Sequence, residues 1–173
     1  MRKLVRFLAA ASIAIGSAPA LAGEAPNDAQ IAHIAYTAGS LDVAAARQAL
    51  RKSQSAAVRE FAGTMVRDHE AVNAKALELV TALKVTPQDN ATSQALSAAA
   101  EKTLQRLNGL SGGAFDKAYV ENEVAFHKSV NDALQSTLIP SAKNGQLKAL
   151  LQTGLTLFRE HQTHAEHLSA ELE

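Results

Sequence analysis

Residues 114–138, AFDKAYVENEVAFHKSVNDALQSTL, have the pattern of a long amphipathic helix. The apolar side chains that share one face at helical spacing are Phe115, Tyr119, Phe126, Val130, Ala133 and Leu134. Glu123 and His127 lie along the edge of this face, one helical turn apart. The stretch therefore predicts a helix that buries an apolar face and carries two polar, chemically active side chains beside it.

The same periodicity occurs in three further long segments of the chain. It runs from Asn27 to Ala49, from Ser55 to Leu83 and from Leu147 to Leu172, and a weaker repeat covers Thr92 to Asn108. No segment has the alternating β-branched pattern of a strand. We therefore predict an all-α fold, a four-helix bundle with an extra short connecting helix between the second and third long helices.

The first 22 residues have the features of a secretory signal peptide. Arg2, Lys3 and Arg6 precede an uninterrupted run of apolar and small residues from Phe7 to Gly16, and Ala20–Ala22 supplies a cleavage site. A transmembrane anchor would need about 20 apolar residues, roughly twice this run. We expect residues 1–22 to be removed and residues 23–173 to form an exported, periplasmic bundle domain without a membrane anchor.

Charge and composition exclude several classes of function. The 173 residues contain 17 Lys and Arg against 17 Asp and Glu, and removal of the three basic residues above leaves 14 against 17. A mildly acidic domain without a basic stripe is a poor nucleic-acid binder. The chain has no Cys, so a bound metal must be held by His, carboxylate or backbone oxygen. The single Gly-rich stretch lacks the strand and the Lys of a phosphate loop, and no nucleotide or organic cofactor is expected.

Five polar side chains are predicted to point inward at a shared depth. Counting residues from the expected helix ends at about 1.5 Å per residue places all of them near the middle of the bundle. These candidate metal ligands are Asp42, His69, Glu123, His127 and His161. Each alone is explained by a hydrogen bond in the core. Together they indicate a metal site, because one ion compensates several buried polar groups at once.

Other polar residues are weaker candidates for such a site. His164 is a possible additional ligand, whereas His33 and His167 fall on polar faces and are expected at the surface. Asp68 is a candidate to orient His69 from outside the ligand set, although a solvated carboxylate is the simpler interpretation. Asp116 and Tyr119 are further candidates for orienting a ligand from outside the ligand set. The simpler interpretation is helix capping for Asp116 and core packing for Tyr119.

Three blocks of sequence resemble a known family. VREFAGTMVRDH (58–69), FDKAYVENEVAFH (115–127) and LFREHQTHA (157–165) are similar to the signature blocks of the bacterial exported proteins of domain-of-unknown-function family 4142. The family's recurring residues fall here on Asp68, His69, Phe115, Asp116, Tyr119, His127 and His161, and Asp42 stands where Glu is common. The resemblance implies a ferritin-like bundle and an exported location. It implies no activity.

The ligand set does not match that of a di-iron oxidase. Those proteins carry Glu and His three residues apart on two helices, whereas Glu123 and His127 are four apart and Val66 precedes His69 by three. A mononuclear Zn, Cu, Fe or Mn site suits the residues better. Two hypotheses follow: an exported metal-binding bundle for storage, buffering or stress protection, and a non-catalytic envelope protein with a metal-free polar network. Whether the chain is an enzyme stays open, and a homodimer is permitted but not specified.

Overall fold

The structure, a computed structural model, describes residues 25–172, and the predicted signal peptide at residues 1–22 lies outside this range. Every regular element of the described residues is helical, which confirms the predicted all-α bundle. The elements are α1 (Asp28–Lys52), α2 (Ala56–Ala82), α3 (Ala91–Asn108), α4 (Gly112–Ala133), the π-helical turn η1 (Leu134–Leu138), α5 (Ile139–Ser141) and α6 (Gly145–Glu171). None of these helices is sufficiently long and apolar to cross a bilayer.

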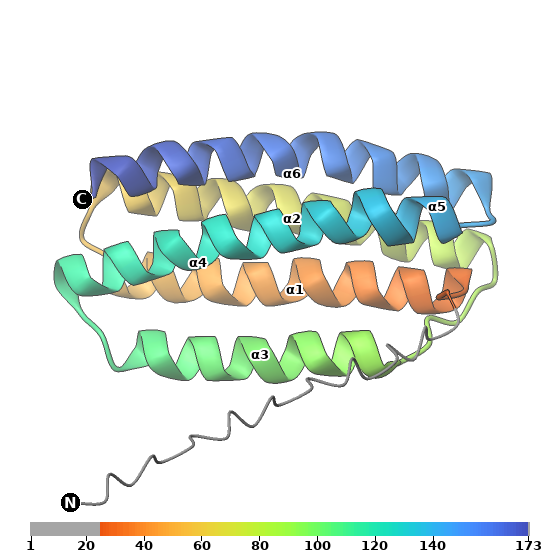
Figure 1. The fold of residues 1–173 in the computed structure, drawn as a ribbon, viewed down its shortest axis with the longest axis horizontal. Coiled ribbons are helices and arrows are strands. Elements are labelled where there is room, and N and C mark those ends of the chain that lie inside the picture. Colours follow the sequence, from red (N-terminus) through yellow and green to blue (C-terminus); the bar gives the residue numbers. More distant parts are fainter. Residues whose placement is uncertain (1–24, 173) are drawn as a thin grey trace, which may run out of the picture.

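Two helical hairpins pack against each other to form the bundle (Figure 1). The pairs are α1 with α2 and α4 with α6, and α2 also packs on α6 while α1 packs on α4. Helix α3 lies along the outer side of α1 and leads from the end of α2 back to the start of α4. Because α3 returns the chain along the whole bundle, α4 runs in the same direction as α2.

Local sequence explains where the helices begin. Asn27 forms a capping box with Gln30 at the start of α1, and Ser55, Asn90 and Asn144 accept backbone N–H groups at the starts of α2, α3 and α6. The Asp28 carboxylate accepts backbone N–H groups of Lys143 and Asn144, each at 2.8 Å. This contact ties the first helix to the turn before the last one.

The third long helix is longer than the sequence indicates. It begins at Gly112, where φ is +57°, and continues through η1 and α5 to Ser141 rather than ending at Leu138. Pro140 was expected in a turn, but it stands inside this continuous helix, in α5 directly after η1. The π-helical turn before it, in which Ile139 N–H donates to the Leu134 carbonyl, allows the helix to continue.

Two apolar clusters fill the bundle. The first contains the large buried side chains Phe61, Met65, Leu107, Phe115 and Tyr119. The second contains Ile31, Ile34, Leu134, Leu147, Leu151 and Phe158 and lies nearer the start of α1. The inward polar residues occupy the level between the two clusters.

Candidate metal centre

The five predicted ligand residues are all buried, and they come from the four long helices. Asp42 is on α1, His69 on α2, Glu123 and His127 on α4, and His161 on α6. Each is at most 4% exposed. All five side chains therefore lie in the interior of the bundle, and their role as ligands stays a prediction.

Three donor atoms form a nearly equilateral triangle in the middle of the bundle. His69 Nε2 lies 3.4 Å from His127 Nε2, and Asp42 Oδ2 lies 3.5 Å and 3.6 Å from these two nitrogens. In a tetrahedral complex, donors about 3.4 Å apart correspond to bonds of about 2.1 Å, the usual Zn–N and Zn–O length. The triangle thus has the size of one face of a tetrahedral metal site.

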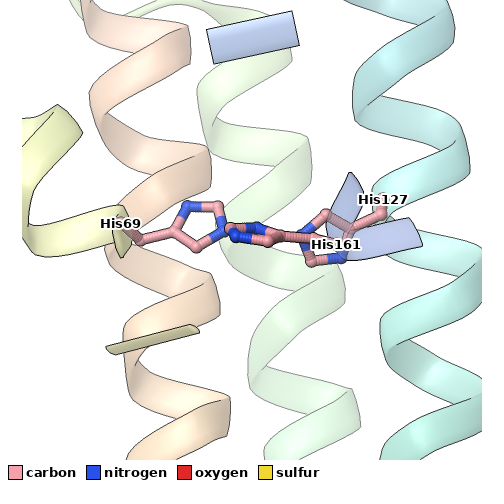
Figure 2. Close-up of side chains that lie close together, drawn as sticks. All are labelled: His69, His127 and His161. Carbon is pink, nitrogen blue, oxygen red and sulfur yellow. The ribbon is translucent and has the colours of Figure 1, made fainter. Parts of the chain in front are cut away.

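Two further candidates border this triangle. One ring nitrogen each of His69, His127 and His161 lies within 4.8 Å of the other two, and the three ring centroids are 5.3–5.5 Å apart. Figure 2 shows the three imidazoles converging. Asp42, Glu123 and His127 form a second group with donor atoms within 4.8 Å. His161 and Glu123 are therefore the residues available for a fourth position.

Two of the histidines are held by their outer nitrogens. His127 Nδ1–H donates to the Glu123 carbonyl at 3.0 Å, and His161 Nε2–H donates to Asp68 Oδ2 at 3.1 Å. These bonds leave the lone pairs of His127 Nε2 and His161 Nδ1 for another partner. A metal-ligating His usually donates its other N–H to a carboxylate or a carbonyl, as these two do.

Burial keeps the histidines neutral. Loss of water lowers the pKa of His69 from 6.5 to about 3, and the neighbouring charges of His127 and His161 add to this effect. Burial likewise lowers the pKa of His127 to about 4, and it lowers the pKa of His161. At neutral pH all three rings are deprotonated, which is the form that binds metal ions.

The two buried carboxyl groups are shifted in the opposite direction. Burial raises the pKa of Asp42 from 3.8 to about 7, although a hydrogen bond with Glu123 moderates the shift. Burial and the charge of Asp42 raise the pKa of Glu123 well above its usual value. The Asp42–Glu123 pair therefore retains a proton at neutral pH, which a bound cation would displace.

Several polar atoms of the centre lack a hydrogen-bond partner among the described residues. They are Nδ1 of His69 and of His161 and, when the Asp42–Glu123 pair has lost its shared proton, both carboxylate oxygens of Asp42 and Oε2 of Glu123. A buried unsatisfied polar group costs about 1–3 kcal/mol. These unsatisfied atoms lie on two histidines and two acids, and an ion at the donor triangle would relieve those of Asp42, Glu123 and His161.

The residues expected around the ligand set, Asp68, Asp116 and Tyr119, lie partly in other positions than the sequence predicts. Asp68 contacts His161 rather than His69, and the neighbouring Arg67 holds the pKa of the Asp68 carboxylate below its usual value. Asp116 was expected to cap its helix, but α4 begins two residues earlier than predicted, so Asp116 lies beyond the first turn and is buried. Tyr119 is buried between the rings of Phe61 and Phe115, as expected for a core residue.

The remaining histidines lie outside the centre. His164 is exposed and packs its ring edge against Phe61, with centroids 5.1 Å apart, so the structure does not bring it to the ligand cluster. His167 is exposed, as expected. His33 is only partly exposed, at 29%, and lies 3.9 Å from Asp89.

The sequence did not reveal the role of Phe158. Its ring stacks on His69 with centroids 4.6 Å apart and an angle of 10° between the planes. Phe158 precedes His161 by three residues on the same apolar stripe, and a stripe residue next to an inward His is the only signal that could have indicated this contact. The stacking fixes the plane of the His69 ring.

Comparison with protein families gives a match over most of the chain. The sequence model of a family described as "Domain of unknown function (DUF4142)" matches residues 12–168. No match to this chain was found among the curated proteins or among the solved structures. The ferritin-like relationship inferred from the sequence therefore stays a prediction.

Proposed function

The chain belongs to the DUF4142 family of domains of unknown function, and we propose from the geometry of its buried centre that it binds one divalent transition-metal ion. Asp42, His69 and His127 supply the first three ligands, and His161 supplies the fourth. Glu123 lies beside Asp42 and His127 as a further carboxylate for the same ion.

The donor triangle of Asp42 Oδ2, His69 Nε2 and His127 Nε2 is the observation on which this proposal depends. Its edges of 3.4–3.6 Å match the spacing of ligands around one tetrahedral ion. A hydrogen-bonded core would bring such atoms to about 2.7–3.2 Å instead. The two distances from Asp42 Oδ2 to the histidine nitrogens, 3.5 Å and 3.6 Å, are too long for good hydrogen bonds. They leave room for a small ion between the three atoms.

The donor chemistry selects among the metals expected from the sequence. Imidazole and carboxylate ligands suit Zn, Cu, Fe and Mn, and the absence of Cys from the chain removes the ligand that favours Cu(I). Zn²⁺ matches the tetrahedral spacing most closely. We therefore expect zinc to bind more tightly than manganese, in accord with the usual order of divalent affinities.

The biological role that we propose is metal buffering or sequestration in the exported space. Residues 1–22 support export by their sequence, although they lie outside the described residues. One ion per bundle suits buffering or protection of the envelope from free metal better than bulk storage. A catalytic role would require a coordination position that a substrate can reach.

The alternative from the sequence is a polar network that holds no metal. The raised pKa values of Asp42 and Glu123 favour it, because a proton shared by the two carboxyl groups satisfies part of the centre. The unsatisfied Nδ1 of His161 is not explained by this alternative. The two hypotheses make opposite predictions about metal content.

Elemental analysis with thermal unfolding distinguishes them. The purified protein, dialysed against zinc and then against metal-free buffer, should retain about one zinc per chain, and EDTA should lower its melting temperature. Substoichiometric metal, together with a melting temperature that neither Zn, Cu, Fe or Mn nor EDTA changes, would favour the metal-free network. Copper, iron and manganese are compared under the same conditions to rank the metals.

A further inference from the structure

The bundle is filled unequally on the two sides of the candidate metal centre. On one side the large rings of Phe61, Phe115 and Tyr119 pack closely and are fully buried. On the other side, toward the start of α1, a cavity of about 550 Å³ lies among the four long helices and the start of α3. This volume is within the usual range for a small-molecule site.

The cavity wall is mostly apolar and carries no charge. Representative lining residues, one or two from each long helix, are Ile34, Val72, Val80, Val130, Leu138 and Leu151. None of the described residues that line the cavity is Asp, Glu, Lys or Arg. An apolar molecule would gain free energy by leaving water for this wall, and a charged group would find no counterion along it.

Small residues keep the space open. Ala35, Ala38, Ala76, Ala133 and Gly154 face the cavity where larger aliphatic side chains would fill it. A Cβ at Gly154 would touch only the ring of Phe158, at 3.4 Å. The space is therefore a consequence of side-chain size at a few positions, and single substitutions can reduce it.

The cavity ends at the candidate metal centre. Its lining includes His69, His127 and Phe158, whereas Asp42 and Glu123 line a separate, smaller cavity of about 80 Å³ beside α3. Along α2 the large cavity extends from His69 to Val80, about 16 Å at the helical rise per residue. Gln30, Asn90 and Thr92 lie along it near the starts of α1 and α3.

We propose that this cavity binds an elongated apolar monocarboxylic acid of the fatty-acid type, whose carboxylate joins the four protein ligands as a fifth donor to the ion, on the side where His69 and His127 line the cavity. The inference rests on the proposed metal site. A divalent ion held by one carboxylate, Asp42, and three neutral imidazoles retains positive charge, and Glu123 lies on the α3 side rather than the cavity side. A carboxylate that enters from the cavity meets the one cation available to it, and its chain lies along the apolar wall.

Dodecanoate tests the inference, because its extended chain is about as long as the cavity. Calorimetric titration into the zinc-loaded protein should give one site. Acetate, which lacks the chain, and dodecanol, which lacks the charge, should each bind at least tenfold more weakly. The metal-free protein should also bind dodecanoate at least tenfold more weakly, because the carboxylate then has no cation.

A cavity-filling variant supplies the structural control. Gly154→Leu should weaken the binding of dodecanoate at least tenfold, and this variant should still bind one zinc per chain. The matched control is Gly63→Leu, the same change in a helix. Gly63 does not line the cavity, and a Cβ at this position would have no atom within 4 Å. This variant should bind dodecanoate with the affinity of the wild type. Ala35→Phe, which fills the cavity from α1, replaces Gly154→Leu if that variant does not fold.

Zinc content measured on the same samples separates the two proposals. Zinc-loaded protein that does not bind dodecanoate overturns the cavity inference and leaves the metal site standing. Equal dodecanoate affinity for Gly154→Leu and Gly63→Leu, for dodecanol and dodecanoate, or for metal-free and zinc-loaded protein also overturns it. A wild-type protein that retains no zinc overturns both proposals.

Discussion

The Nε2 atoms of His69 and His127 face each other across 3.4 Å in the interior of the bundle, and both rings are almost completely buried. They come from parallel helices, α2 and α4, that the chain joins through the long return of α3. The folding topology therefore places two neutral imidazoles at a separation that suits one ion better than a direct hydrogen bond.

Removal of either facing histidine should abolish metal binding. His69→Ala and His127→Ala each delete one corner of the donor triangle, so the melting temperature of these variants should no longer rise on addition of zinc. His33→Ala changes a histidine that lies outside the centre and should keep the full increase. An equal loss in all three variants would mean that zinc binds nonspecifically.

Asp68 should act by positioning His161. Loss of a partner that orients a metal-bound histidine typically costs about 10–100-fold in metal affinity, and Asp68→Asn is expected in that range. The matched control is Asp132→Asn on α4, an exposed carboxylate away from the centre. Competition with a zinc-sensitive dye measures both affinities. Unchanged affinity in Asp68→Asn would remove His161 from the ligand set.

The carboxyl pair should make the metal-free protein lose stability as the pH rises from about 4 through the pKa of about 7 for Asp42. Asp42 and Glu123 have raised pKa values in the folded state, so the folded protein holds a proton that the unfolded chain has already released. Each such proton lowers the free energy of unfolding by about 1.4 kcal/mol per pH unit. The lowered pKa values of His69 and His127 act in the opposite direction, but only between about pH 3 and 6.5.

Urea unfolding of EDTA-treated wild type and of Asp42→Asn/Glu123→Gln between pH 5 and 9 isolates the carboxyl effect, because the histidines contribute alike to both proteins. The wild type should lose stability relative to this variant as the pH rises across this window. Identical slopes for the two proteins would show that the carboxyl pair holds no proton in the folded state.

Asp28 should stabilise the fold without affecting the metal. Its carboxylate accepts two backbone N–H groups of the turn before α6, and Asp28→Ala leaves both without this partner. We expect a loss of about 1 kcal/mol in the free energy of unfolding, measured with urea, because water can reach these N–H groups. Zinc stoichiometry should stay at one per chain. A variant as stable as the wild type would show that water replaces the carboxylate at no cost.

The fold and the depth of the candidate site could be predicted from sequence because both depend on helical regularity. Apolar spacing indicated each long helix, and the constant rise per residue placed Asp42, His69, His127 and His161 at one level. The start of α2 also followed directly, because Ser55 is a residue that caps helices.

The contacts between helices could not be predicted in the same way. Whether Asp68 meets His69 or His161 depends on how far α2 and α6 are rotated about their axes, which periodicity along one helix does not determine. The direction of α4 depends on the path of α3. The helix continues past Pro140 because a π-helical turn precedes it, and such a turn has no clear sequence signal.

The most direct test is a crystal structure of the zinc-loaded protein with anomalous scattering recorded at the zinc absorption edge. The account predicts one zinc peak between α1, α2 and α4, about 2.1 Å from Asp42 Oδ2, His69 Nε2 and His127 Nε2. A zinc peak elsewhere, for example at the exposed His164 and His167, with the centre unoccupied after loading, would contradict it.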